Sequence, residues 1–384
     1  MGKDFTNLEM FVLIFILIIL GNLNYHIIGA GSFEKNDISH LLHFNSFDLE
    51  FNETNAYDHI STQLGFGFRV PGTSAHTNCS NWIISQMQST TSLVSTHEFI
   101  IQKEGEPSYN CQNILGKINP DRENIVIFGA HWDSRNISEK ALTNREKPIP
   151  GANDGGSGVG VLIELARVLS LYQSYLDSQI WFLFIDAEDQ GYTQGMYGIQ
   201  GWEYCEGSKV FVEEIDDFYD SSSESFECFI LLDMVGGTNL EFIKESRSDD
   251  DLHESIFNEG RALGYIQSFP SEAKSMVIKD DHLAFMNIGM PVIDLIIDFI
   301  YGEWTYHHTL SDDLSNIDPE SLKITGRTLE SFIKTYYTTG TEQNWRDEFP
   351  KWLYISLFVG SGLLLVIVGI VLKKRIWAGN SILK

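Results

Sequence analysis

The chain has 384 residues, 43% of them hydrophobic, enough to bury the core of one large globular domain or two modest ones. Asp and Glu number 53 against 26 Lys and Arg, so the formal net charge is −27. A surface this acidic repels phosphate backbones, which makes nucleic acid a poor candidate partner. Solubility or a salty habitat would favour the same excess of acids, so the charge alone assigns no function.

The first predicted element is the apolar run MFVLIFILIIL at residues 10–20. The run has the length of the hydrophobic part of a signal peptide, and the small residues GAGS follow it. We therefore interpret residues 1–31 as a cleaved signal peptide, with an uncleaved N-terminal anchor as the alternative.

The last predicted element is an uncharged apolar run over residues 353–372, long enough to cross a bilayer. Lys373, Lys374 and Arg375 follow it, which predicts that the short basic tail at 373–384 is cytoplasmic. Residues 32–345 would then form an extracytoplasmic domain, joined to the transmembrane helix by a juxtamembrane segment at 346–352.

Glycosylation triplets and cysteines agree with an extracytoplasmic, membrane-anchored domain. The triplets begin at Asn52, Asn78 and Asn136. Four cysteines are an even number, as a disulfide-forming compartment favours. Of three possible connectivities, sequence-local pairing joins Cys79 to Cys111 and Cys205 to Cys228.

Between the two ends, helical and strand-like segments follow one another in chain order. A Pro-Gly turn in RVPGT leads into a helix-like pattern that runs to residue 87. Residues 158–172 place apolar side chains at helical spacing, and residues 319–337 form an amphipathic helical pattern. The predicted strands are HEFIIQ (97–102), QNILGKI (112–118), NIVIFGAH (124–131), QIWFLFIDA (179–187), CFILLDM (228–234) and PVIDLII (291–297).

The alternation of strands and helices predicts an α/β domain with a largely parallel sheet. Runs that are apolar on both faces are typical of central strands covered by helices on each side. Function in such a sheet lies where strands end and loops begin. Acidic and histidine side chains gather at those ends: His131, Asp133, Asp186, Glu188, Asp189, Asp233, His307 and His308.

The glycine-rich loop GANDGGSGVG at residues 151–160 is a candidate phosphate cradle or metal loop. A Walker loop requires a lysine that is absent here, because Ser157 follows Gly156 directly. The dinucleotide fingerprint fails because Val161 stands where its third glycine should be. Asp154 in the middle of the loop would also repel an anion, so we predict no nucleotide site.

The metal interpretation fits the residue types better. Imidazole and carboxylate ligands without thiolates suit a catalytic zinc site, and carboxylates can bridge two ions held roughly 3.5–4 Å apart. Glu188 would stay uncoordinated and move protons, while Asp133 would orient His131. Each residue alone could be a turn or cap residue, so the prediction depends on the joint pattern. The predicted ligands are His131, Asp154, Asp189, Asp233 and His308.

These blocks together resemble the zinc aminopeptidase and glutaminyl cyclase family. HWDS, GANDGGSG, IDAEDQG, LLDMVG, KDDHLAFMNIGMPVIDLI and HHTLSDD occur in the family's order over roughly residues 63–338, after an opening RVPGT. The resemblance implies a three-layer α/β/α sandwich around a central mixed sheet. It also implies that Asp154 bridges, that Asp189 and His308 complete one zinc site, and that His131 and Asp233 complete a second in the aminopeptidases. Glu188 would be the general acid/base.

Two positions depart from the family pattern. Asp189 stands where many members have Glu, and His307 stands where many have an aromatic residue, commonly Trp. The His-Thr-x-x-Asp register makes His308 the ligand.

Two activities follow from the resemblance. A cyclase would use one zinc ion to convert an N-terminal Gln to pyroglutamate, whereas an aminopeptidase would use two to hydrolyse the first peptide bond. Asp280-Asp281-His282 resembles the cyclase form of a motif that commonly reads Ser-Asp-His in aminopeptidases, so we favour the cyclase. Asp281 would then hydrogen-bond with Glu188.

A metal-free binding ectodomain is the third possibility, because related folds serve as receptors. The intact set of acidic and histidine residues argues against it. Under either enzymatic interpretation the substrate is a peptide or protein N-terminus. The aromatic residues Trp202, Trp304, Tyr301 and Tyr306 are candidates for the walls of its pocket, with core packing as the alternative.

Overall fold

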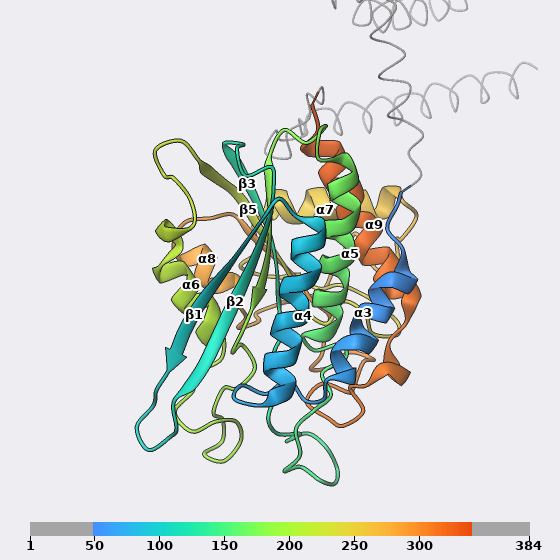
Figure 1. The fold of residues 1–384 in the computed structure, drawn as a ribbon. Coiled ribbons are helices and arrows are strands. Elements are labelled where there is room, and N and C mark those ends of the chain that lie inside the picture. The colour runs from blue at the N-terminus through green and yellow to red at the C-terminus, as the bar shows by residue number, and fades with distance from the viewer. Residues whose placement is uncertain (1–48, 340–384) are drawn as a thin grey trace, which may run out of the picture. The chain divides into compact units, whose positions relative to one another are not determined.

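The computed structural model describes residues 49–339 (Figure 1). The predicted signal peptide or anchor at 1–31, the juxtamembrane segment, the transmembrane helix at 353–372 and the basic tail lie outside these residues and stay predictions. Within residues 49–339, no helix combines the length and apolarity that crossing a bilayer requires.

A mixed sheet of six strands, in the order β1-β2-β4-β3-β5-β8, forms the centre of the described domain. β2 pairs antiparallel with β1 and β4, and the other three pairs are parallel. The prediction of an α/β fold with a mixed, largely parallel sheet is therefore confirmed. The strands are β1 (Leu93–Ile101), β2 (Tyr109–Ile118), β3 (Asn124–His131), β4 (Gln179–Ile185), β5 (Ser225–Leu232) and β8 (Val292–Leu295), with β6 (Lys244–Glu245) and β7 (Ser275–Met276) in a separate small sheet.

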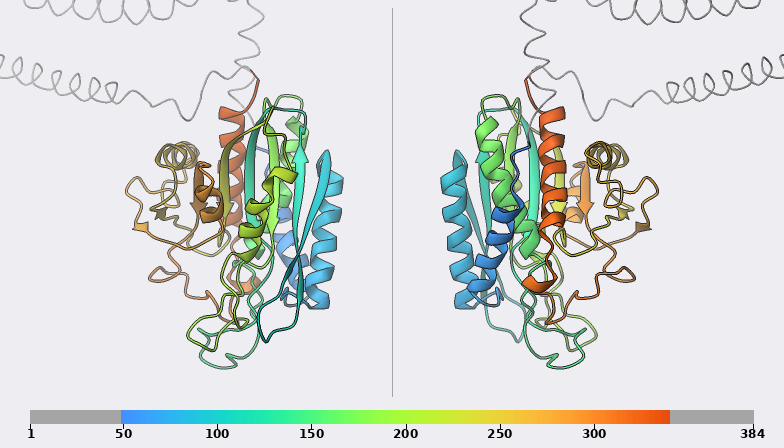
Figure 2. Two further views of the ribbon diagram at one scale, coloured as in Figure 1. Left: turned by 90° about the vertical axis from the view of Figure 1, so that its left-hand side faces the viewer. Right: turned by 90° about the vertical axis from the view of Figure 1, so that its right-hand side faces the viewer.

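Helices cover both faces of the sheet. α3, α4, α5 and α9 lie on one face and the shorter α6 and α8 on the other, as the opposite views of Figure 2 show. The helices are α3 (Glu53–Gly65), α4 (Ser74–Thr90), α5 (Gly156–Tyr172), α6 (Glu206–Glu213), α7 (Asp250–Ala262), α8 (His282–Asn287) and α9 (Pro319–Tyr336), with 3₁₀ turns η1 (Ile215–Asp217) and η2 (Leu314–Asn316).

The central strands are apolar on both faces because each face has its own hydrophobic core. In β3, Val126 and Phe128 join the core under α4 and α5, whereas Ile125 and Ile127 join the core under α6 and α8. Successive side chains of a strand point to opposite faces, so a strand covered by helices on both sides needs an uninterrupted apolar run. This is why the sequence pattern identified these strands.

The cysteine pairing predicted from the sequence is wrong. All four cysteines lie within the described residues, are buried and form no disulfide. Cys79 packs on the α4 side of the sheet, whereas Cys111 belongs to a separate cluster around Trp202. Cys205 precedes α6, and Cys228 lies within β5 beside the Tyr337 hydroxyl. Both predicted pairs therefore separate into different environments.

Close packing of α5 on the sheet depends on a glycine of the 151–160 loop. A Cβ added to Gly158 would lie 2.3 Å from the carbonyl oxygen of Leu232 and 2.8 Å from Ala130 Cβ. Both neighbours belong to strands that end at the edge of the sheet described below. Gly158 therefore sets how closely the α5 N-terminus approaches that edge.

We expect Gly158→Ala to lower the free energy of unfolding by about 1–3 kcal/mol or more, because the added methyl meets backbone that cannot rotate away. Gly65→Ala is the matched control, since a Cβ at Gly65 meets no atom within 4 Å at the end of α3. We expect this control to leave the stability within about 0.5 kcal/mol or to raise it. Chemical denaturation of both variants is the measurement, and equal stabilities would contradict the packing argument.

Candidate metal centre

The predicted ligands meet at one edge of the sheet because four strands end there in parallel. His131 is the last residue of β3 and pairs in register with Ile185, the last residue of β4. Asp233 directly follows β5, and Glu188 and Asp189 lie in the loop after β4. The carboxyl ends of neighbouring parallel strands lie side by side, so residues far apart in the sequence come together.

Asp154 is held at this edge by the loop that carries it. The Asp312 carboxylate accepts hydrogen bonds from the backbone N–H groups of Asn153 at 2.7 Å and Asp154 at 3.2 Å. Gly155 has a φ of +79°, and a Cβ there would lie 2.8 Å from Cε1 of His131. The loop thus turns tightly beside the His131 ring, as the metal-loop prediction requires.

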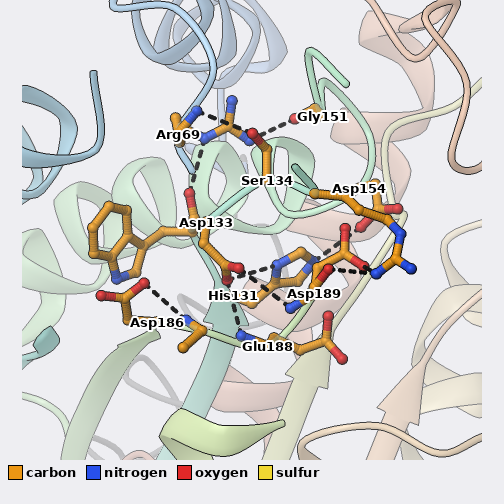
Figure 3. A network of polar contacts seen from close by, with 12 residues as sticks. Arg69, His131, Asp133, Ser134, Gly151, Asp154, Asp186, Glu188 and Asp189 are labelled. Carbon is orange, nitrogen blue, oxygen red and sulfur yellow. Dashed lines mark hydrogen bonds and ion pairs between the residues drawn. The ribbon is translucent and has the colours of Figure 1, made fainter. Parts of the chain in front are cut away.

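Arg69, from the predicted RVPGT turn, joins this loop to the end of β3 (Figure 3). Its buried guanidinium donates to the carbonyl oxygens of Trp132 at 2.8 Å, Pro150 at 2.9 Å and Gly151 at 2.7 Å. Its backbone N–H also donates to Ser134 Oγ at 3.0 Å. Arg69 therefore fixes the backbone directly after His131 and shortly before Asp154, two of the predicted ligands.

Asp154 faces two histidines with its two carboxylate oxygens. Its Oδ1 lies 3.2 Å from His131 Nε2, and its Oδ2 lies 3.7 Å from His308 Nε2. His131 Nε2 also lies 3.4 Å from Asp233 Oδ1, and His308 Nε2 lies 3.1 Å from Asp189 Oδ1. The five predicted ligands thus form two groups that share Asp154, the arrangement needed for a bridging carboxylate.

The atoms of the predicted ligands have the character of a metal site. Asp154 Oδ2 and Asp189 Oδ2 are buried and have no hydrogen-bond partner within the described residues. An unsatisfied buried polar atom costs about 1–3 kcal/mol, and a charged one costs more. A cation coordinated by these atoms would offset that cost, and imidazole with carboxylate is a donor set that zinc accepts. The residues therefore fit zinc.

His307 adds a second imidazole at the Asp154–His308 side. Its Nε2 lies 3.8 Å from Asp154 Oδ2, so His307, His308 and Asp154 also form a compact group of possible ligands. The Lys140 ammonium contacts His307 Nδ1, and the Phe299 ring packs against the imidazole. Lys140 offers only donors, so Nδ1 of His307 is the acceptor in this contact.

His308 is oriented by a carboxylate that the sequence analysis did not identify. Glu139 Oε1 lies 2.7 Å from His308 Nδ1, and Arg135 donates to Glu139 Oε2 at 2.8 Å. Arg135 also donates to the Asp189 carbonyl oxygen at 2.7 Å. Such outer contacts fix the orientation of an imidazole ligand. Burial lowers the pKa of His308, but Asp189 and Glu139 outweigh it and raise that pKa to about 9.

Asp133 lies beside His131, as predicted, and it also anchors the loop after β4. Its Oδ1 is 3.5 Å from His131 Nδ1. The same carboxylate accepts from the backbone N–H groups of Glu188 at 3.0 Å and Asp189 at 3.2 Å, and from Gln190 Nε2 at 2.9 Å. Asp133 thus lies beside the predicted ligand His131 and holds the backbone of the predicted acid/base Glu188.

Asp280, rather than Asp281, lies in the cleft with Glu188. Glu188 and Asp280 both line a cleft of about 300 Å³ that also contains Asp154, Asp189, Asp233, His307 and His308. Asp281 instead accepts from Ser208 Oγ at 2.5 Å, and its other oxygen has no partner within residues 49–339. The predicted hydrogen bond between Asp281 and Glu188 is therefore absent from the described structure. The cause is the start of α8, since the backbone turns between the two aspartates.

Burial raises the pKa of Glu188 well above its usual range; His131 opposes the rise, and Asp189 and Asp281 add to it. A carboxylate of raised pKa is a stronger base, as general acid/base catalysis near neutral pH requires. The rest of the cleft wall includes Tyr204, Met234, Ile296 and Phe299. The four aromatic residues named from the sequence do not line it, and two of them, Trp202 and Trp304, are buried in the hydrophobic clusters.

Comparison with known proteins gives one family. A sequence model described as peptidase family M28 matches residues 113–333. A glutaminyl-peptide cyclotransferase from Gloydius blomhoffii is 23% identical over 251 residues, which are 59% of this chain and 66% of the relative. The chain therefore matches slightly less than two thirds of that relative's length.

The similar solved structures include a glutaminyl cyclase and a zinc-dependent exopeptidase. A glutaminyl cyclase from Bacteroides thetaiotaomicron, bound to N-acetylhistamine, is 31% identical with a TM-score of 0.68, and the match covers 74% of this chain and 98% of that one. A Zn-dependent exopeptidase from Parabacteroides distasonis is 32% identical with a TM-score of 0.68, covering 74% and 99%.

We expect Asp154→Asn to lower zinc affinity by more than about 100-fold, because it removes the charge that both groups share, whereas loss of an outer contact costs only about 10–100-fold. Asp233→Asn should affect only the group that contains His131. The measurement is zinc content after dialysis against buffers of defined free zinc, with the exposed Asp121→Asn as the control. Wild-type zinc content in Asp154→Asn would refute the shared site.

Proposed function

The chain belongs to peptidase family M28, and from that premise we propose that it is a zinc-dependent glutaminyl-peptide cyclotransferase. The observation that carries the proposal is the cleft in which Glu188 and Asp280 lie beside the Asp154–Asp189–His308 group. Two comparisons support it, because relatives of this chain in sequence and in structure are glutaminyl cyclases. The substrate class would be peptides or proteins with an N-terminal Gln.

The cleft suits a positively charged N-terminus. Five carboxylates line it, and among its lining residues within 49–339 Lys279 is the one lysine or arginine. With Asp154 and Asp189 assigned to zinc, Glu188, Asp233 and Asp280 would still favour an α-ammonium group over an anionic ligand, and this group must lose one proton before it can attack. The lining carboxylates are Asp154, Glu188, Asp189, Asp233 and Asp280.

In the proposed reaction, the α-amine of the substrate attacks Cδ of its own Gln side chain. The new C–N bond closes the ring, the bond from Cδ to the side-chain nitrogen breaks, and ammonia leaves. Glu188 would take the proton from the α-amine and return it to the departing nitrogen, so the carboxylate ends the cycle as it began. Zinc bound to Asp154, Asp189 and His308 would supply Lewis-acid polarisation of the side-chain carbonyl.

An aminopeptidase is the second candidate, favoured by a specific observation. His131, Asp154 and Asp233 form a complete additional group of possible ligands, so the site offers protein ligands for two ions. Two ions are a recurrent device for peptide hydrolysis, in which a water molecule replaces the substrate's own amine as the nucleophile. The Zn-dependent exopeptidase among the similar structures supports this alternative.

We expect the zinc-loaded protein to release ammonia from a Gln-initiated peptide and to leave a Leu-initiated peptide intact. Product masses and ammonia are the measurement. Release of free amino acid from either peptide would establish the aminopeptidase instead, and no change in either peptide would contradict both candidates.

Glu188→Gln should slow the reaction by about 10²–10⁴-fold, the usual contribution of a positioned acid/base. Zinc content should stay at the wild-type level. Glu206→Gln is the matched control, because the Glu206 carboxylate, eighteen residues further along the chain, pairs with Lys103 at 2.8 Å. Equal rates in the two variants would remove Glu188 from the mechanism.

A further inference from the structure

The buried thiol of Cys205 lies against the carboxylate of Glu188. Its Sγ is 3.4 Å from Glu188 Oε1, and the residue is 4% exposed. Nothing in the proposed reaction uses this thiol. We infer that Cys205 is a positioning residue for Glu188, whose S–H donates to Oε1 and holds the carboxylate in the cleft. The catalytic meaning of this inference rests on the proposed function, but the contact itself does not.

The backbone places the thiol independently of the S–H contact. Cys205 N–H donates to the Glu188 carbonyl oxygen at 2.9 Å, and Glu206 N–H donates to the Ala187 carbonyl oxygen at 3.1 Å. These bonds join the start of α6 to the loop after β4. The thiol therefore lies on backbone that is hydrogen-bonded to the backbone of the residue it contacts.

The local backbone is strained where this contact forms. Cys205 has a φ of +61° and Ala187 a φ of +58°, both in the left-handed region that costs a non-glycine residue roughly 1 kcal/mol or more. A Cβ added to Gly207 would lie 1.9 Å from the Asp186 carbonyl oxygen, so α6 begins in direct contact with the loop. The strained conformations on both sides of the contact are held by the two backbone hydrogen bonds.

The Glu188 carboxylate has few alternative donors. Within residues 49–339, the Cys205 thiol is the side chain that hydrogen-bonds it, and the nearby Asp280 offers a further carboxylate. Without the thiol, no side-chain hydrogen bond from within residues 49–339 would fix the direction of this carboxylate. Misplacing a catalytic group slows the chemical step more than it weakens substrate binding.

The first test compares Cys205→Ala, Cys205→Ser and wild-type protein as full-length, zinc-loaded chains acting on the Gln-initiated peptide. We expect kcat to fall about tenfold in Cys205→Ala, equivalent to about 1.4 kcal/mol and close to the worth of one hydrogen bond. KM should stay within about twofold, and Cys205→Ser should recover part of kcat because a hydroxyl can also donate.

The matched control is Cys79→Ala, which deletes a thiol that is also buried but lies in the apolar core on the α4 side of the sheet. It should lower the stability without changing kcat. If Cys205→Ala keeps the wild-type kcat, or if its kcat falls only in proportion to lost folded protein or lost zinc, the positioning role is refuted.

The second test measures the contact between the Cys205 thiol and Glu188 by a method that needs no activity assay. The infrared S–H stretching band of Cys205, assigned by its loss in Cys205→Ala, should lie at lower frequency than that of Cys79 and should rise in Glu188→Leu, which removes the acceptor. A band that does not move in Glu188→Leu would overturn the inference. If wild-type protein converts neither peptide, the proposed function fails, and this band still decides whether the thiol donates to Glu188.

Discussion

The site depends on keeping one carboxylate, that of Asp154, out of water and between two imidazoles. Asp154 is 3% exposed, and each of its oxygens faces a different histidine. Burying a charge is costly unless it is paired, so the surrounding structure must fix the partners as well as the carboxylate. Asp312 holds the backbone of Asp154, Glu139 orients His308, and Asp133 lies beside His131. The outer carboxylates are therefore as necessary to the arrangement as the predicted ligands.

The central strands and the convergence of the five predicted ligands could be foreseen from the sequence, because strands and strand ends leave signals that are local in the chain. A strand buried on both faces requires a continuous apolar run, and Ile125, Val126 and Ile127 show why, since they alternate between two cores. His131 ends β3 and Asp233 directly follows β5, so these two predicted ligands stand at the end of such runs. Helices α3, α6, α7 and α8 were not predicted. They lie outside the segments whose apolar spacing was recognised, and their caps, such as Asn52 and Asp249, resemble ordinary turn residues.

Three features could not be predicted from the sequence, because they depend on the direction in which a side chain points rather than on the residue type. Asp280 and Asp281 are adjacent and chemically equal, and only the start of α8 determines that the first lies in the cleft while the second contacts Ser208. Glu139 lies eight residues beyond the end of β3, in the irregular segment before α5, so no strand-end pattern pointed to it as a partner of His308. The predicted cysteine pairs were wrong for the same reason, since nearness along the chain does not determine in which part of the core a thiol is buried.

Ligand identity alone cannot separate a cyclase from an aminopeptidase, because the two reactions differ in the nucleophile. Hydrolysis needs an activated water molecule, for which a second ion at His131 and Asp233 would serve. Cyclisation needs the amine of the first residue to approach that residue's own side chain. The cleft must therefore hold the first residue in this conformation, and a side chain of the cleft must accept the proton of the amine. Both reactions require a base at the position of Glu188. The property that separates the two reactions is therefore whether the cleft of about 300 Å³ holds the substrate's own amine, or an activated water molecule, beside Glu188.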